Sequence, residues 1–284
     1  MGVVDTLTAL CNGNLASGEI TLADGTPALL LVNPTKVECG IAEQGSDLLV
    51  VLHTREGESN LVIDLQPSST LKIIHVSLAA VECRCELRQQ SHSECYINSI
   101  AVGGGKLDYV VNLNESHAYS SLRSAFIAGG KERVKVGVKV NHNVADCNSF
   151  SLVKGIAGGE AVGEFEGMVY VAPDAQRTDA VQTSRNIVIG DTARIQTKPQ
   201  LEIYADDVKC SHGATVGQLD DKALFYMQQR GISYKEARLL LMFAFVNEVI
   251  DTIRMDALKD RLHLLVEKRF RGELNKCQGC AICK

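Results

Sequence analysis

Tryptophan is absent from the 284-residue chain, aromatic residues make up only 5% of it, and prolines number 5 against 24 glycines. This profile favours many short strands joined by tight turns over a helical bundle. No apolar run reaches about 18 residues, so the sequence predicts no membrane-spanning helix. The first residues show no basic segment followed by an apolar one, which argues against a secretory signal peptide and predicts a cytoplasmic protein.

The charge balance excludes another class of protein. The chain has 29 basic and 34 acidic residues, for a net charge of −5, so a general nucleic-acid binder is not expected. Its hydrophobic content of 45% is enough to build a real core. The length corresponds to one or two domains.

Ten cysteines are present, which is many for a chain without an export signal. Reduced thiols are therefore the better interpretation than disulfides. The first seven lie mostly among β-branched residues, where a free cysteine is commonly a small buried hydrophobe. They are Cys11, Cys39, Cys83, Cys85, Cys95, Cys147 and Cys210, and the remaining three form a separate group at the end of the chain.

Hydrophobic residues alternate with polar ones from about residue 19 to residue 204. The clearest run places Val134, Val136, Val138 and Val140 on one face of a strand. No helical pattern interrupts this region, so a βαβ fold is disfavoured and a sandwich, a barrel or a parallel solenoid remains. The absence of a strict internal repeat counts mildly against a solenoid with identical rungs.

The pattern becomes helical after residue 218. Asp220 and Asp221 can cap a helix over residues 222–230, and Gly231 suits the position that follows its end. Ser233 and Glu236 match a capping box for the next helix, whose apolar run at residues 239–246 predicts burial on all sides. A third helical stripe follows from Ile250 to Leu265. The sequence predicts an all-β body over residues 1–218 and a helical unit with a cysteine-rich tail over residues 219–284.

Two short motifs suggest a phosphate loop and a glycosidase acidic pair, but neither matches the pattern that its function requires. Gly103-Gly104-Gly105-Lys106 is followed by Leu107 instead of Ser or Thr, and position 100 is Ile, so a turn is favoured over a phosphate loop and no bound nucleotide is expected. Asp206 and Asp207 offer the only support for a carbohydrate-active solenoid. Strand alternation would place them on opposite faces, which disfavours the paired geometry that glycoside hydrolysis needs.

A zinc site can be imagined among Cys83, Cys85, His92 and Cys95. Cys83 and Cys85 would face the same way in a strand. Their spacing with His92 and Cys95 matches no closed zinc module, so core or surface cysteines are the favoured interpretation.

The most specific signal is a long run from Lys198 to Thr215, which reads KPQLEIYADDVKCSHGAT and continues through residues 216–220, 224–226 and 230–232. An upstream series fits the same pattern at residues 165–167, 174–176, 178–180, 182–183 and 185–186. These runs closely resemble the SufBD family of iron-sulfur cluster assembly proteins, and Cys210-Ser211-His212-Gly213 resembles its SufD branch. The resemblance is dense over about residues 147–250 and weak before them.

The resemblance implies a right-handed parallel β-helix with a C-terminal α-helical unit, which selects the solenoid among the open folds. It implies a non-catalytic scaffold subunit that completes an assembly site with a SufB-like subunit, or pairs with itself as a dimer. A SufC-like ATPase would dock on the C-terminal helices, about Ser233 to Phe270. The implied cofactor is a transient iron-sulfur cluster shared with the partner, and His212, with Cys210 beside it, is the implied cluster-site residue.

The residues themselves agree with this implication. In a strand, Cys210 and His212 project to one face with Cα atoms about 6.6 Å apart. Thiolate and imidazole both bind iron. Two ligands are too few for a stable cluster, so the others must come from a partner or from sulfide.

The last three cysteines suggest an alternative function, a metal- or cluster-binding module centred on the tail. Cys277, Cys280 and Cys283 repeat at the three-residue spacing of iron-sulfur ligand runs. A fourth cysteine at the expected distance is missing, so three thiolates would need an outside ligand. This tail is not a hallmark of the SufBD family.

Overall fold

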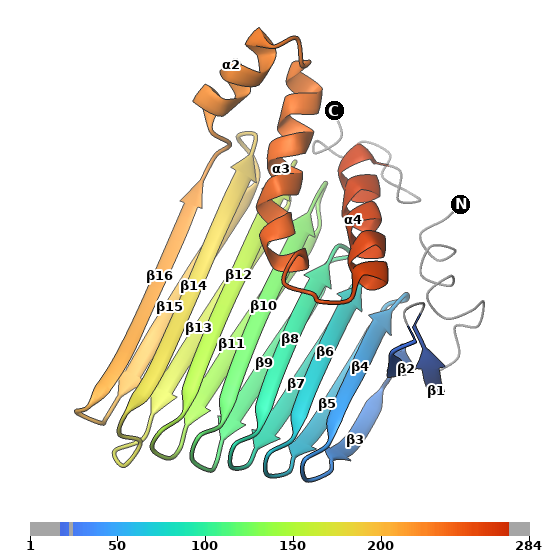
Figure 1. The fold of residues 1–284 in the computed structure, drawn as a ribbon. Coiled ribbons are helices and arrows are strands. Elements are labelled where there is room, and N and C mark those ends of the chain that lie inside the picture. Colours follow the sequence, from blue (N-terminus) through green and yellow to red (C-terminus); the bar gives the residue numbers. More distant parts are fainter. Residues whose placement is uncertain (1–17, 23–24, 273–284) are drawn as a thin grey trace.

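The computed structural model describes residues 18–22 and 25–272. Sixteen strands in the described residues form two sheets, one of nine strands and one of seven (Figure 1). The nine-stranded sheet contains β1 (Gly18–Thr21), β2 (Pro27–Val32), β4 (Ser46–His53), β6 (Thr70–Ser77), β8 (Glu94–Ala101), β10 (Tyr119–Ala128), β12 (Asn148–Gly158), β14 (Thr178–Ile189) and β16 (Val208–Gly217). The seven-stranded sheet contains β3 (Lys36–Ile41), β5 (Gly57–Leu65), β7 (Val81–Gln89), β9 (Gly105–Leu113), β11 (Arg133–His142), β13 (Val162–Val171) and β15 (Arg194–Ile203).

From β2 onward the chain alternates between the two sheets, and each strand pairs in parallel with the strand two places away in sequence. This arrangement confirms the predicted parallel β-helix and rules out the sandwich and the barrel. Neighbouring strands of the nine-stranded sheet begin 24 residues apart at β4 and β6 (Ser46 and Thr70). They begin 30 residues apart at β14 and β16 (Thr178 and Val208). The growing rung length explains why the sequence shows no strict repeat.

The interior between the sheets holds the main hydrophobic core. Val134, Val136, Val138 and Val140 all point into it, as their alternation predicts. Phe126 of β10 is among the largest fully buried side chains of this core. This core runs through most of the solenoid, and a smaller separate cluster fills its last rungs.

The glycine run at residues 103–105 is a turn between β8 and β9, as expected. Gly104 and Gly105 have φ angles of +83° and +93°, which favour glycine. A Cβ at Gly103 would collide with the backbone of Leu78 and Ala79 in the preceding rung. Close stacking of turns, and not phosphate binding, explains the glycines.

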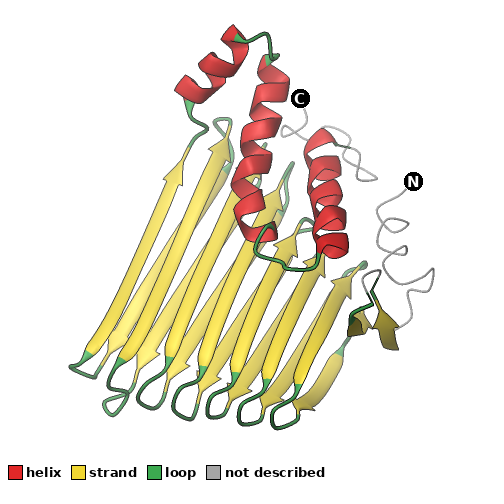
Figure 2. Ribbon diagram, in the orientation of Figure 1, coloured by secondary structure: helices red, strands yellow, loops and turns green. Residues whose placement is uncertain are grey.

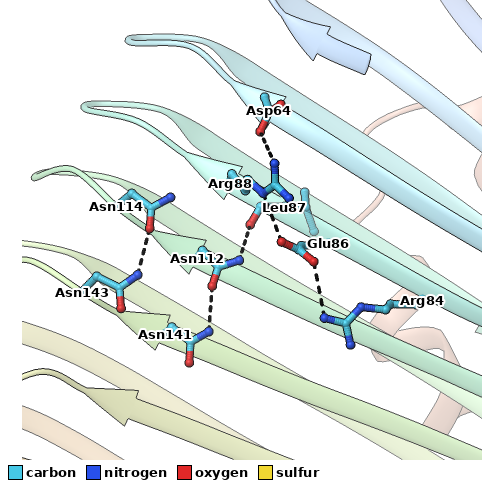
Figure 3. A network of polar contacts seen from close by, with 9 residues as sticks. All are labelled: Asp64, Arg84, Glu86, Leu87, Arg88, Asn112, Asn114, Asn141 and Asn143. Carbon is cyan, nitrogen blue, oxygen red and sulfur yellow. Dashed lines mark hydrogen bonds and ion pairs between the residues drawn. The ribbon is translucent and has the colours of Figure 1, made fainter. Parts of the chain in front are cut away.

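The outer face of the seven-stranded sheet carries ladders of polar side chains (Figure 3). Asn141 donates to Asn112 at 2.8 Å, and Asn143 donates to Asn114 at 2.8 Å. Beside them, Arg88 bridges Asp64 and Glu86. Such contacts between neighbouring rungs reinforce the strand register on a face that is open to solvent.

Three helices follow the last strand: α2 (Asp221–Gln229), α3 (Tyr234–Ile250) and α4 (Asp256–Arg271). The Asp220 side chain accepts hydrogen bonds from the backbone N–H groups of Lys222 and Ala223, and Ser233 accepts one from Glu236. Gly231 follows α2 with a φ of +83°. The predicted caps at Asp220, Ser233 and Gly231 are therefore confirmed, whereas the Glu236 carboxylate pairs with Arg271 and does not complete the predicted capping box.

The expectation that residues 239–246 are buried on all sides is wrong. Leu239, Met242 and Val246 are buried, but Leu240 and Ala244 are exposed. The helix packs with one face only, because α3 lies across the outside of the solenoid and not within it (Figure 2).

The helices α3 and α4 cover the outer face of the nine-stranded sheet, where they form a second core with outward-facing residues of its strands. Two ion pairs fix this contact. Lys154 of β12 is almost fully buried and pairs with Glu248, and Arg269 of α4 pairs with Glu132. None of the helices in the described part of the chain is long and apolar enough to cross a membrane.

A buried histidine at the end of β11 makes the stability of the fold depend on pH. His142 is fully buried; its Nε2 lies 2.8 Å from Ser149 Oγ, and burial lowers its pKa from 6.5 to about 4. Because the unfolded chain takes up this proton near pH 6.5 and the folded chain only near pH 4, stability is full above pH 6.5 and falls as the pH drops towards 4.

We expect His142→Asn to weaken this dependence. Between pH 7 and pH 5 the wild type should lose about 2 kcal/mol more unfolding free energy than the variant, as measured by urea denaturation. His117→Asn is the matched control, because His117 is exposed in a turn. Equal losses in wild type and His142→Asn would contradict the assignment.

Candidate functional site at the C-terminal end of the solenoid

Both sheets end at the last rung of the solenoid, where β15 and β16 have a neighbouring strand on one side only. In Figure 1 these two strands form the edge farthest from the N-terminal strands. Most of β16 is exposed, and a Cβ at Gly213 or Gly217 would meet nothing within 4 Å. The described chain therefore leaves two strand edges and the end of its interior uncovered.

Cys210 and His212 lie on this terminal rung. In the parallel register Cys210 is paired with Ala180 and His212 with Gln182, and both partners are fully buried. Because paired residues share a face, Cys210 and His212 occupy interior positions, as the sequence predicted for one common face. His212 is nevertheless exposed, since no further rung covers it.

The two side chains differ in their surroundings. Cys210 is half-buried and packs against the small core formed around Val169, Val171 and Ala180. Burial, reinforced by the negative charge of Asp179, raises the pKa of the Cys210 thiol. The thiol is thus mostly protonated at neutral pH, whereas the exposed His212 imidazole is accessible from outside.

A buried amide lies directly behind His212. The side chain of Gln182 is fully buried, and neither its oxygen nor its nitrogen has a hydrogen-bond partner among the described residues. Gly167 of β13 leaves the room for this amide, because a Cβ there would come within 2.5 Å of it. Buried polar groups without partners are rare, so the end of the interior is poised to take up another polar group.

Gln182 was not identified as a site residue from the sequence. The only signal was its place in the upstream run of the resemblance. Its role depends on register, because Gln182 and His212 are thirty residues apart and meet only through the pairing of β14 with β16. The sequence alone does not give the number of residues in one rung, so it does not predict this pairing.

The acidic pair Asp206 and Asp207 does not lie on opposite faces of a strand, so that expectation is wrong. Both residues are exposed in the turn between β15 and β16, where strand alternation does not apply. The Asp207 carbonyl oxygen accepts from the backbone N–H of Arg177, and its N–H donates to Gln176 Oε1. The two carboxyl-bearing residues therefore belong to a structured turn.

The four residues considered for zinc are not brought together as a set. Cys83, Cys85 and Cys95 are buried free thiols in the core, and Cys83 and Cys85 share a face as expected. His92 lies in a turn, where its ring stacks on that of His117 with centroids 4.7 Å apart. Cys83 instead meets His53 and His75 across the interior, a grouping that the sequence did not suggest.

The tail cysteines Cys277, Cys280 and Cys283 lie outside the described residues. Their interpretation as metal or cluster ligands stays a prediction. Reconstitution with iron and sulfide of the wild type and of a variant with all three cysteines changed to serine would test it.

Comparison with known proteins agrees with this geometry. Residues 41–245 match the model of the SufBD core domain of the SUF system for iron-sulfur cluster assembly. The chain is 36% identical over 179 residues to the iron-sulfur cluster assembly protein SufD of Escherichia coli strain K12, an alignment covering 62% of this chain and 42% of that protein.

Two further relatives show the same relationship. The SufBD family protein slr0076 of Synechocystis is 43% identical over 132 residues, covering 46% of this chain and 29% of that protein. SufD of Bacillus subtilis is 26% identical over 160 residues, covering 56% and 37%. The chain thus spans less than half the length of these relatives. Because the family model covers most of the solenoid together with part of the helical region, the chain belongs to the SufBD family of iron-sulfur cluster assembly proteins.

Proposed function

We propose that this chain is a SufD-like scaffold subunit, itself not an enzyme, that completes a site for building an iron-sulfur cluster together with a SufB-like partner. The observation that carries the proposal is the uncovered terminal rung, which presents Cys210 and His212 at interior positions above the buried Gln182. The cluster is the transient cargo of this site, and its remaining ligands come from the partner or from sulfide.

The strand edges support pairing at this end. An exposed strand edge offers unpaired backbone donors and acceptors that favour association with another strand. Apolar side chains are exposed beside it, at Ile203, Tyr204 and Val216. A second β-helix placed here would cover both edges and bring its own ligands to His212. Two copies of this chain could pair in the same way when no partner is present.

The two side chains differ in how readily they bind iron near neutral pH. A neutral imidazole binds iron or transfers a proton near neutral pH, whereas the Cys210 thiol must first lose a proton against a raised pKa. His212 is therefore the more critical residue in the proposed site. Its exposure at the end of the solenoid makes it accessible to a partner without any change in the core.

Pairing through this edge predicts a specific effect of charge. We expect Val216→Asp to weaken association with the SufB-like partner by roughly tenfold or more, because the change buries a carboxylate in the interface. Leu29→Asp is the matched control, since Leu29 is an exposed apolar residue at the opposite end of the solenoid. Affinity is measured with the purified proteins by titration; equal losses for both variants would argue against pairing at β15 and β16.

The C-terminal helices are the proposed docking surface for a SufC-like ATPase. Four large apolar side chains are exposed on α2 and α3, namely Phe225, Tyr226, Tyr234 and Leu240. Aromatic residues are enriched among those that dominate the binding energy of interfaces. Nucleotide dependence would then come from the partner, and this chain would bind no nucleotide. The opposite face of α3 is already used to cover the nine-stranded sheet.

We expect the double change Phe225→Ser and Tyr234→Ser to reduce ATPase binding by roughly tenfold or more, with the helical content unchanged by circular dichroism. Tyr204→Ser is the control, because Tyr204 is equally exposed but lies beside β15. Unchanged ATPase affinity in the double variant would mean that the helices only cover the sheet.

The proposed cellular location of the protein is the cytoplasm. The six cysteines within the described residues are free thiols, which suits a reducing compartment.

A further inference from the structure

A second group of metal-ligating side chains lies inside the solenoid, in its N-terminal half. His53 ends β4, His75 belongs to β6, and Cys83 belongs to β7 of the opposite sheet. A ring nitrogen of each histidine and the Cys83 sulfur lie within 4.8 Å of one another. All three residues are at most 4% exposed. The group therefore joins the two sheets across the interior.

Hydrogen bonding orients His75 toward Tyr109. The Tyr109 hydroxyl donates to Ser99 Oγ at 2.8 Å and lies 2.7 Å from Nδ1 of His75; in the tautomer with Nδ1 protonated, it accepts a hydrogen bond from that nitrogen. Nε2 of His75 then keeps its lone pair. Histidines that bind metals characteristically donate their other ring N–H to a neighbour in this way.

The ring nitrogens that remain have nothing to bind. Nε2 of His53 and Nε2 of His75 are buried and have no hydrogen-bond partner among the described residues. Ser59 is the strand neighbour of Cys83 in the register of β5 and β7. Leaving two buried polar atoms unpaired in one place is unfavourable unless something binds to them.

The donor atoms of the three side chains determine which metal ion would bind. Two imidazoles and a thiol, with no carboxylate in the group, suit a borderline divalent ion such as Zn²⁺ and not the oxygen-seeking Mg²⁺ or Ca²⁺. Three protein ligands leave one position for water, as in other open zinc sites.

A surface hollow of about 440 Å³ on the seven-stranded sheet has Cys83 and Ser59 among its lining residues. Its lining includes the carboxylates of Glu58, Glu82 and Asp108, together with the cationic Arg84 and Lys106. Glu58 and Glu82 place negative charge on this face of the sheet, while Asp108 is paired with Lys106.

We propose that His53, His75 and Cys83 bind one zinc ion inside the solenoid, where it links the two sheets at a place remote from the terminal rung. The site is independent of the proposed cluster chemistry, because its residues come from β4, β6 and β7 and those of the terminal site from β14 and β16. Its binding of metal can therefore be tested on the chain alone.

The test uses the full chain with Cys277, Cys280 and Cys283 changed to serine, which removes the tail as a competing metal site. After treatment with a chelator, the protein is titrated with Zn²⁺ alone and its metal content is measured. In a parallel titration Co²⁺ replaces Zn²⁺, since bound cobalt shows visible bands for four-coordinate geometry and a near-ultraviolet band for a thiolate ligand. We expect one equivalent of either ion and both sets of bands.

Two variants separate ligation from a general effect on the core. Cys83→Ser should remove the thiolate band and weaken zinc binding by roughly tenfold or more, while Cys85→Ser, at an equally buried neighbouring thiol, should leave both unchanged. Circular dichroism checks that each variant is folded. Less than 0.2 equivalents of zinc in the parent chain, or a thiolate band that Cys83→Ser retains, would overturn the proposal whatever the fate of either variant.

Discussion

Phe126→Ala is expected to lower the free energy of unfolding by about 3–5 kcal/mol and the melting temperature by roughly 10 °C. Phe126 is among the largest fully buried side chains of the solenoid. Removing its ring leaves a cavity that the strands cannot close, because each is held by a neighbour on both sides. Phe225→Ala is the control: that ring is 63% exposed, so its loss should change stability by about 0.5 kcal/mol or less.

The space for the Phe126 ring is provided by two glycines. A Cβ on Gly155 of β12 would collide with the end of the ring and with Asn186, and a Cβ on Gly163 of β13 would come within 2.6 Å of the ring. Gly155→Ala alone should destabilise the protein by about 1–3 kcal/mol through overpacking. In a Phe126→Leu background, part of that loss should disappear.

A double-mutant cycle measures this coupling. Urea unfolding of wild type, Gly155→Ala, Phe126→Leu and the double variant should give a coupling energy above about 1 kcal/mol. Strict additivity of the two changes would show that Gly155 and Phe126 do not share the space that the structure assigns to them.

The sequence predicted the parts of this fold that depend on local pattern. Alternation in the run from Val134 to Val140 identified a strand and its inner face, and the capping residues Asp220 and Ser233 located two helix starts. These features depend on neighbours within a few residues. The choice of a solenoid came from the resemblance, since alternation alone is equally compatible with a sandwich.

Contacts that depend on the register between rungs could not be predicted from the sequence. His53 and Cys83 are thirty residues apart, and they meet only because β4 and β7 lie in opposite sheets of neighbouring rungs. Leu240 lies within an apolar run but is exposed, because only one side of α3 meets the sheet. Periodicity along a chain contains no information on how many residues one turn of a solenoid takes.

His212→Ala is expected to have the largest effect on function. The exposed imidazole contributes nothing to the core, so its removal should leave the fold intact, with no change in melting temperature beyond about 1–2 °C. In the proposed site it is the ligand of this chain that is exposed to a partner. Without it, the complex should retain its subunits and lose its cluster. Ser211→Ala is the matched control, because Ser211 lies between the two site residues and faces the other way.

We propose that His212 belongs to a cluster site shared between this chain and its partner. The most direct measurement is the iron and acid-labile sulfide bound per complex after anaerobic assembly with the SufB-like subunit and the ATPase. Subunit composition is determined on the same preparation. We expect equal content for wild type and Ser211→Ala, and at least roughly tenfold less for His212→Ala in an intact complex. Full iron and sulfide in His212→Ala, or loss of the complex itself, would contradict it.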